Sequence, residues 1–400
     1  MMLCARVRCD ECNQGTTRKS ETMRTLAVNA LRMAQQRTGI GRYIEFVAQQ
    51  WSRMKIPFDR VVLMSPKNIE VNGFGRVTPV EVKVFGGQYP AAIGEQVCFP
   101  KTAKGAAMLF CPSYTCPLLH RGRMVLANHG FYEALPGEFS WFVRLRATLL
   151  QRYSAKRAER VIANSLATKA DLVRFFGISP EKIDTIYPSA HDFYFQRHDP
   201  AAIKEEVIRT LGKEMPYIIF VGKLAKRRHV PNLIEAFAIV RRQQNLPHAL
   251  LIVGPNTTNV PVAEIARQHG VGDAVVYRPY AELEPLARLY AGADVYALPT
   301  IYEGISYTMF EAMASGTAVL TVKHPTLEEG AGDAALAMPT PSVEDLAAGL
   351  STLLLDEGLR RRYAKQGRER AKRFSWETVA RETMRILDCV ADKEDRKGYC

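Results

Sequence analysis

The sequence lacks any apolar run near the roughly 18 residues that a membrane-spanning helix needs. Its apolar stretches are short, such as residues 217–221 and 249–253, so we expect no segment that crosses a membrane. No secretory signal is evident, and scattered cysteines in a long chain argue against a disulfide framework. We therefore expect a reduced, cytoplasmic protein. The cysteines are Cys4, Cys9, Cys12, Cys98, Cys111, Cys116, Cys389 and Cys400.

Metal-binding patterns are also lacking. Cys4, Cys9 and Cys12 lie close together, but three thiols without a fourth ligand nearby do not indicate a zinc site. No cluster of carboxylates suited to magnesium is present, so we expect neither a metal nor another cofactor. A strand-like run begins directly after Met23, and we expect residues 1–22 to form a disordered extension.

With 400 residues, the chain is too long for one hydrophobic core of ordinary size. Short β-branched or apolar runs alternate with longer segments of helical period, which is typical of α/β proteins with parallel sheets. We expect two Rossmann-like, doubly wound domains that face a central cleft. Strands are expected at residues 25–28, 60–64, 80–84, 106–110, 123–127, 160–163, 183–187, 217–221, 249–253, 274–277, 294–298 and 318–322.

A polar stretch at residues 191–213 suggests an interdomain connection with a boundary near residue 195. The expected parts are therefore residues 23–195, residues 196–374, a C-terminal helix at residues 375–390 that returns to the first domain, and a polar tail at residues 391–400. Doubly wound sheets bind ligands at the carboxyl ends of their strands, so two facing sheets would share one cleft.

Positive charge is concentrated in the first half. Residues 23–192 carry 23 Lys and Arg against 12 Asp and Glu, whereas residues 193–400 carry 27 against 26. This asymmetry favours an anionic partner for the first domain, either a phosphate-bearing lipid, an anionic membrane surface or nucleic acid. A solvated basic surface without a partner is an equally weighted alternative.

The segment from residue 293 to residue 320 reads ADVYALPTIYEGISYTMFEAMASGTAVL. An apolar strand leads into a loop with Glu303 and Gly304, and Ser306 can cap the helix that contains Glu311. The amides of Ile305, Ser306, Tyr307 and Thr308 would form an anion site for a diphosphate at the start of that helix. Glu311 would reach hydroxyls beside it, although spacing alone favours two solvated surface glutamates.

The segment VGKLAKRRHVPNLIEAF begins with a strand and continues into a basic loop. Gly222, Lys223, Arg227 and Arg228 belong to that loop, at the carboxyl end of the strand. Its cations could neutralise a leaving diphosphate without a metal, because fixed charges in a closed cleft stabilise developing negative charge. An isolated basic loop in solvent is the alternative.

Together the two segments resemble the retaining glycosyltransferases of family 4, from residue 23 to residue 387. Members carry two glutamates separated by seven residues in a context like YEGFGLPVLEAMACGTPV, and Glu303 and Glu311 take those places. The family has an Arg and a Lys in the loop after the first strand of its second domain. Here Lys223 and Arg228 stand at those positions with the residue types exchanged.

Further blocks follow the family in the same order. RTGIGRY resembles its glycine-rich loop, in which Gly39 and Gly41 would let the backbone approach the donor phosphates and the acceptor. ANHGFYEALP resembles a block that usually reads His-Asp, so His129 matches and Gly130 replaces the acid. The C-terminal block FSWETVARETMRIL resembles the family's final helix.

The resemblance implies a GT-B fold, with the acceptor on the first domain and a nucleotide-sugar on the second. Lys223 and Arg228 would hold the leaving diphosphate, Glu303 would orient the sugar, Glu311 would bind ribose, and His129 would contact the sugar near the reacting carbon. The expected reaction is retaining hexosyl transfer from a GDP- or UDP-sugar, with mannose favoured, to a glycan or lipid-linked acceptor in polysaccharide synthesis. We expect no nucleic-acid partner.

Two other functions compete with this interpretation. A nucleotide-sugar epimerase or a sugar phosphorylase with a GT-B fold would use the same cleft. A basic binding or scaffold protein without catalysis is the second alternative.

The segment of residues 139–160 is the expected site of peripheral docking on the inner membrane face. Trp141, Phe142, Leu145 and Leu149 would share one face of a helix that is otherwise rich in arginine and lysine, as in helices that lie in the membrane interface. The alternative is a domain helix that buries this apolar face in the core.

Overall fold

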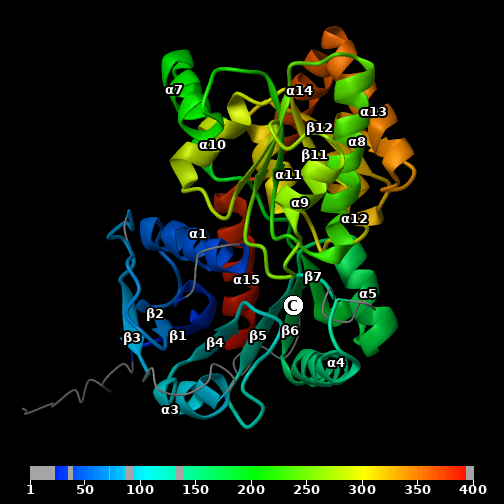
Figure 1. Ribbon diagram of the computed structural model, residues 1–400. Helices are drawn as coiled ribbons and strands as arrows, with labels where there is room; N and C mark the ends of the chain where they lie inside the picture. The colour runs from blue at the N-terminus through cyan, green and yellow to red at the C-terminus, as the bar shows by residue number, and fades with distance from the viewer. Residues whose placement is uncertain (1–22, 35–38, 72, 86–92, 132–137, 393–400) are drawn as a thin grey trace, which may run out of the picture.

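The computed structural model describes residues 23–34, 39–71, 73–85, 93–131 and 138–392, and it contains two parallel sheets (Figure 1). The first sheet has seven strands in the order β3-β2-β1-β4-β5-β6-β7. Its central strands are fully buried, because helices cover both faces. The strands are β1 (Thr25–Asn29), β2 (Arg60–Ser65), β3 (Val80–Val84), β4 (Met108–Cys111), β5 (Met124–Asn128), β6 (Arg160–Ala163) and β7 (Ile183–Thr185).

The second sheet has six strands in the order β10-β9-β8-β11-β12-β13. In both sheets the strand order reverses beside the first strand, between β1 and β4 and between β8 and β11. Loops that leave such a point diverge and open a crevice. The strands are β8 (Tyr217–Val221), β9 (Ala249–Val253), β10 (Val275–Arg278), β11 (Val295–Leu298), β12 (Ala318–Val322) and β13 (Leu336–Met338).

The α/β fold class with two parallel sheets is confirmed. Every predicted strand is present, with ends that shift by a few residues. The prediction missed β13, a three-residue edge strand whose side chains are only partly buried. So short a strand produces no readable period, and its pairing with β12 defines it.

Helices cover the faces of both sheets. Leu26 and Val28 of β1 join the core on one face of the first sheet, and Ala27 joins the core on the other, as strand geometry requires. The longer helices are α1 (Gly39–Arg53), α4 (Trp141–Arg157), α5 (Leu166–Phe176), α7 (Pro200–Leu211), α8 (Val230–Gln243), α10 (Leu283–Ala291), α11 (Tyr307–Ala314), α13 (Val343–Leu355), α14 (Glu357–Ala371) and α15 (Trp376–Ala391). The shorter ones are α3 (Phe99–Thr102), α6 (Asp192–Phe195), α9 (Val262–Gln268) and α12 (Pro325–Ala331).

Helix α15 packs on the first sheet although it follows the second in sequence. Figure 1 shows this red helix in the lower half of the molecule, beside β4 and β5. Its apolar face, with Trp376 and Leu387, belongs to the same core as α1. The Trp51 indole of α1 donates a hydrogen bond to the carbonyl oxygen of Ala380 at 2.9 Å. The chain end therefore ties the two halves together.

Cys98, Cys111 and Cys116 carry free thiols. The predicted N-terminal extension and polar tail lie outside the described residues, apart from the first residues of the tail. Among the helices that the structure describes, none combines the length and the apolar character needed to cross a membrane.

We predict that Leu387→Ala destabilises the protein by about 2–5 kcal/mol, because it leaves a cavity where α15 meets the first sheet. Leu387 is fully buried. Arg381→Ala on the same helix is the control, because the Arg381 side chain is 63% exposed. Urea unfolding followed by tryptophan fluorescence measures both, and equal midpoints would contradict the role assigned to α15.

Candidate functional site

The carboxyl ends of the two sheets face each other across a cleft of about 380 Å³. The loops that follow β1, β5, β8 and β11 form its walls, so it lies where the strand order of both sheets reverses. All of the site residues predicted from the sequence line this cleft. They are Gly39, Gly41, His129, Gly222, Lys223, Arg227, Arg228, Glu303, Gly304, Ile305, Ser306, Tyr307, Thr308 and Glu311.

The loop after β11 delivers one carboxylate and one helix start to the cleft. β11 ends at Leu298, and Glu303 and Gly304 follow in the loop. The Ser306 hydroxyl then accepts a hydrogen bond from the backbone amide of Met309 at 3.2 Å, so Ser306 is the N-cap of α11. The first turn of α11 therefore begins in the lining of the cleft, where Ile305, Ser306, Tyr307 and Thr308 lie.

Glu303 is buried in a cage of cations. Both Nε and Nη2 of Arg228 lie 2.8 Å from Glu303 Oε1, and Nη2 of Arg227 lies 3.7 Å from the same oxygen. All three side chains are about nine-tenths buried, so their charges are weakly screened by water. Arg227 also donates from its backbone amide to Glu138 Oε1 at 2.6 Å, which links this cage to the first domain.

Glycines make room for this arrangement. Gly222 has a φ of 147°, and a Cβ there would lie 1.7 Å from Nη1 of Arg228. A side chain at Gly222 would therefore displace the guanidinium. Among the described residues, no three His, Cys, Asp or Glu side chains group closely enough to hold a metal ion. The cleft instead offers Lys223, Arg227 and Arg228 to an anionic ligand.

Glu311 is buried on α11, in the same half of the molecule as Glu303. Its Oε1 lies 3.2 Å from Nη1 of Arg42, and its Oε2 accepts a hydrogen bond from the Tyr290 hydroxyl at 3.3 Å. Burial raises the pKa of Glu311, while the charge of Arg42 and the hydroxyls of Tyr290 and Tyr194 oppose that rise. The ion pair crosses from one domain to the other, because Arg42 belongs to α1.

The imidazole of His129 is held by the protein on both sides. Its Nε2 lies 2.9 Å from the carbonyl oxygen of Pro112, which can only accept, so Nε2 carries the proton. Nδ1 then accepts from the Tyr307 hydroxyl at 3.3 Å. Burial lowers the pKa of His129 to about 4, although the bond to Pro112 opposes this. His129 is therefore a neutral residue near neutral pH.

The position after His129 has no room for the acid that the related motif carries. Gly130 has a φ of 110°, and a Cβ there would lie 2.7 Å from Cα of Gly304. A Cβ on Gly304 would in turn lie 1.8 Å from the carbonyl oxygen of His129. The Ser165 hydroxyl donates to the carbonyl oxygen of Gly304 at 2.6 Å and fixes this approach. Two glycines thus bring the backbones of the two halves into contact.

Sequence reasoning missed several residues of the cleft. Arg42 stands in the RTGIGRY block directly after its glycines. This position of a cation could have indicated that Arg42 lines the cleft. Gly254 follows β9 with a φ of 144°, and its missing Cβ lets the backbone of Gly222 approach. Tyr280 also lines the cleft, at the end of β10. Loop residues such as Tyr280 carry no periodic signal, so only the fold places them here.

Helix α4 lies within the predicted docking segment of residues 139–160, and it exposes apolar side chains while it buries polar ones. The residues with large exposed fractions are apolar: Trp141 at 72%, Phe142 at 62% and Leu149 at 57%. The residues that face the domain are small or polar, with Gln151 and Ser154 buried. The alternative that this helix buries its apolar face in the core is therefore wrong.

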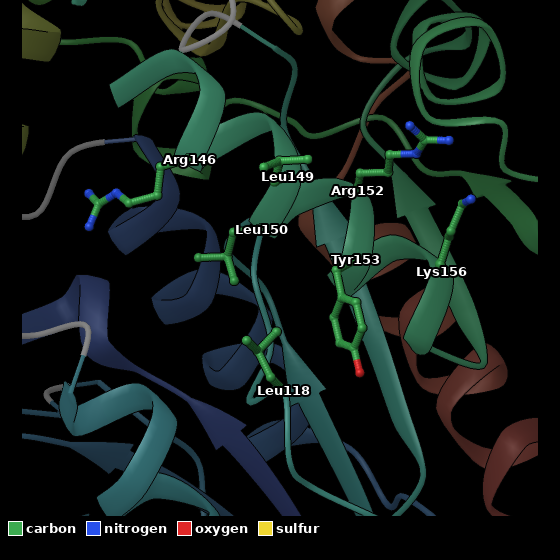
Figure 2. A pocket seen from close by; sticks show the side chains of 7 residues that line it. All are labelled: Leu118, Arg146, Leu149, Leu150, Arg152, Tyr153 and Lys156. Carbon is green, nitrogen blue, oxygen red and sulfur yellow. The ribbon is translucent and has the colours of Figure 1, made fainter. Parts of the chain in front are cut away.

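A shallow apolar groove of about 580 Å³ lies on α4. Figure 2 shows the side chains of Leu118, Leu149, Leu150 and Tyr153 gathered between Arg146 on one side and Arg152 and Lys156 on the other. Figure 1 shows α4 at the edge of the lower half, beside α5. The surface thus combines exposed apolar groups with flanking cations.

Comparison with known families identifies the protein class. The profile described as "Glycosyltransferase Family 4" matches residues 38–190, and the profile "Glycosyl transferases group 1" matches residues 203–370. The first match covers the first sheet from β2 to β7, and the second covers all strands of the second sheet. The chain belongs to the family 4 glycosyltransferases. Its class is therefore that of the sugar-transferring enzymes, as the sequence predicted.

Curated relatives are about one quarter identical to the chain over the part of the sequence that aligns. The MMP alpha-(1->4)-mannosyltransferase of Mycolicibacterium hassiacum is 27% identical over 243 residues, which are 60% of this chain and 56% of that protein. The O-antigen chain mannosyltransferase B of Escherichia coli is 24% identical over 232 residues, which are 58% of this chain and 61% of that protein. The chain thus matches little more than half the length of these relatives.

Solved structures with low sequence identity to the chain have the same fold. HepE of Anabaena, determined in complex with UDP and glucose, matches with a TM-score of 0.71 at 18% identity, over 92% of this chain and 100% of that chain. WaaG, a glycosyltransferase involved in lipopolysaccharide biosynthesis, matches with a TM-score of 0.70 at 17% identity, over 91% of this chain and 99% of that chain. The expected GT-B fold is confirmed.

We predict that the imidazole of His129 stays neutral from about pH 8 down to about pH 5, because burial disfavours its charged form. Its pKa in the folded chain, about 4, lies below the ordinary value of 6.5. Its contribution to stability is therefore complete above pH 6.5 and is lost as the pH falls toward 4. Long-range ¹H–¹⁵N NMR spectra, with His129→Asn to assign the signal, measure the titration. A midpoint near 6.5 would contradict this environment.

Proposed function

We propose that this protein is a retaining glycosyltransferase that moves a hexose from a nucleotide-sugar to a glycan or lipid-linked acceptor. The observation that carries the proposal is the cation-lined cleft between the two sheets, where Lys223 lines the wall and Arg227 and Arg228 contact Glu303. A leaving nucleoside diphosphate is a multiply charged anion, and preorganised cations stabilise the charge that develops as it departs. The GT-B fold supports a reaction between two domains.

Each predicted residue has a role in this proposal. Lys223 and Arg228 hold the diphosphate, and the first amides of α11 add hydrogen bonds to it. Glu303 orients the sugar, and its pairing with Arg228 fixes the carboxylate in the wall. Neutral His129 contacts the sugar near the reacting carbon. The donor phosphate takes the proton of the acceptor hydroxyl on the same face, which retains the anomeric configuration.

Mannose is the favoured sugar, and GDP-mannose is the favoured donor. The names of two curated relatives, both mannosyltransferases, support this choice. HepE was solved with UDP-glucose, so a UDP-sugar is the alternative donor. Purified protein incubated with each candidate donor and an acceptor extract distinguishes them by the nucleotide that is released.

An epimerase or a phosphorylase would use the same cleft without the acceptor that we propose. An epimerase converts the donor alone, and a phosphorylase consumes inorganic phosphate. Incubation with the nucleotide-sugar alone, followed by chromatography of the sugar, identifies an epimerase, and incubation of a glycan with inorganic phosphate identifies a phosphorylase by the sugar phosphate that it releases. Conversion of the sugar without any acceptor would overturn the transferase proposal.

We predict that Arg228→Ala lowers kcat by a factor on the order of 10² to 10³, because the lost charge acts most strongly as the glycosidic bond breaks. Lys226→Ala is the matched control, since Lys226 lies in the same turn, η5 (Lys226–Arg228), but is exposed to solvent. Steady-state kinetics with saturating donor measures both variants. If KM for the donor rises while kcat is unchanged, Arg228 acts instead in ground-state binding.

The exposed face of α4 supports a further part of the proposal, which is peripheral docking on the inner face of an anionic membrane. Trp141 and Phe142 are suited to the interface between headgroups and acyl chains, and Arg146, Arg152 and Lys156 to anionic headgroups. The pairing of Glu138 with Arg227 places the start of this helix near the donor loop. A docked α4 would therefore hold the cleft close to a lipid-linked acceptor.

We predict that the protein sediments with vesicles that contain anionic lipid, remains in solution with neutral vesicles, and is released by high salt, because the attraction between the basic residues and the headgroups is screened. Each cation contributes about 1 kcal/mol near an anionic surface. Arg146→Glu combined with Arg152→Glu should thus abolish sedimentation. The control reverses two exposed arginines elsewhere, Arg361→Glu and Arg381→Glu. If the two double variants sediment equally with anionic vesicles, α4 is not the docking surface.

A further inference from the structure

Arg42 crosses the cleft from one half of the molecule to the other. It lies on α1, yet its Nη1 is 3.2 Å from Glu311 Oε1 and donates to the Tyr194 hydroxyl at 3.4 Å. Its side chain is 15% exposed, and that of Glu311 is 8% exposed. The two residues and Tyr280 line the same part of the cleft. A charged contact between domains therefore lies within the ligand space.

Glu311 depends on this contact for its counter-charge. Helix α11 reads YTMFEAMA and contains no basic residue. The other groups bonded to the carboxylate, Tyr290 and Tyr194, are neutral hydroxyls. Burial of an unpaired carboxylate is so unfavourable that the group takes up a proton instead. The ionised form of Glu311 is therefore supported by a residue of the opposite domain.

We propose that Arg42 is a donor-positioning residue, which holds the Glu311 carboxylate in the orientation that accepts hydrogen bonds from the nucleotide ribose. This inference rests on the proposed function and on the assignment of Glu311 to ribose that the family resemblance implies. A carboxylate has about four lone-pair positions, so the donors from Arg42, Tyr194 and Tyr290 fix its plane and leave a position for a ribose hydroxyl. Donor affinity thus depends on contact between the two domains.

Among the titratable groups around Arg42, Glu311 is the one whose charged form Arg42 supports near neutral pH. Burial raises the pKa of the surrounding tyrosines above their usual value of 10, so they are uncharged at such pH values. Burial also lowers the pKa of the nearby histidine. The groups that face Glu311 or Arg42 are Tyr194, Tyr280, Tyr290, Tyr296 and His191.

The test compares the affinity for a ribonucleotide with that for its 2′-deoxy form. Isothermal titration calorimetry with GDP and 2′-deoxy-GDP, and with the UDP pair in parallel, gives a ratio in which the diphosphate contribution cancels. For the wild type we expect a ratio on the order of ten, since one hydrogen bond to a charged group is lost. Arg42→Gln should lower the ratio, and more strongly at the lower of two pH values, about 6.5 and about 9, because loss of the counter-charge favours the protonated form of Glu311.

The ratio should recover in Arg42→Gln as the pH rises toward about 9, because deprotonation restores the carboxylate. A merely structural role of Arg42 would not produce this recovery. Arg42→Lys keeps a positive charge and should preserve the ratio at both pH values. Arg53→Gln, at the other end of α1 and exposed, is the matched control and should behave as wild type.

Glu311→Gln separates failure of this inference from failure of the proposed function. If Glu311→Gln loses the ratio and Arg42→Gln keeps it at both pH values, Arg42 is not a positioning residue. If Glu311→Gln keeps the ratio, the assignment of Glu311 to ribose is wrong. Should Arg42→Gln fail to fold, as judged by circular dichroism, loss of the ratio in Arg42→Lys at both pH values would overturn the counter-charge argument.

Discussion

Two buried carboxylates in the cleft, Glu303 and Glu311, constrain the rest of the site. Neither can stay ionised away from water unless cations and hydrogen-bond donors surround it. The loop after β8 supplies Arg227 and Arg228 to the first, and α1 supplies Arg42 to the second. The charges are therefore supplied by segments that are far apart in the sequence. Arg227 and Arg228 meet Glu303 when the second sheet forms, whereas Arg42 reaches Glu311 only when the two halves come together.

The approach of the two halves depends on the backbone as well as on charge. Gly130 and Gly304 touch where most residues would clash, and Ser165 holds the contact with a hydrogen bond. This contact accounts for the missing acid after His129, since any Cβ at Gly130 would push the loop of Glu303 away. Helix α15 reinforces the arrangement from the other side, because it continues the second half and packs on the first.

Helix α4 contributes to the molecule in a different way. A helix that exposes Trp141, Phe142 and Leu149 and buries Gln151 and Ser154 gains little from apolar burial in its own domain. Core formation does not explain such a pattern, whereas an external apolar and anionic surface would. The same helix begins next to Glu138, which binds the loop of Arg227. Docking and donor binding would thus act on adjoining segments.

The sequence by itself determined the α/β class, all strands but β13, and the spacing of Glu303 and Glu311 in one motif. Strand runs and motif spacing are local properties of the chain. It also contained the charge difference between the halves. Only the tertiary structure decided that Arg42 neutralises Glu311, that Gly130 meets Gly304, and that α4 turns its apolar side chains outward. Each of these depends on which surfaces meet after the sheets form, and residues more than a hundred positions apart leave no period in a single sequence to predict it.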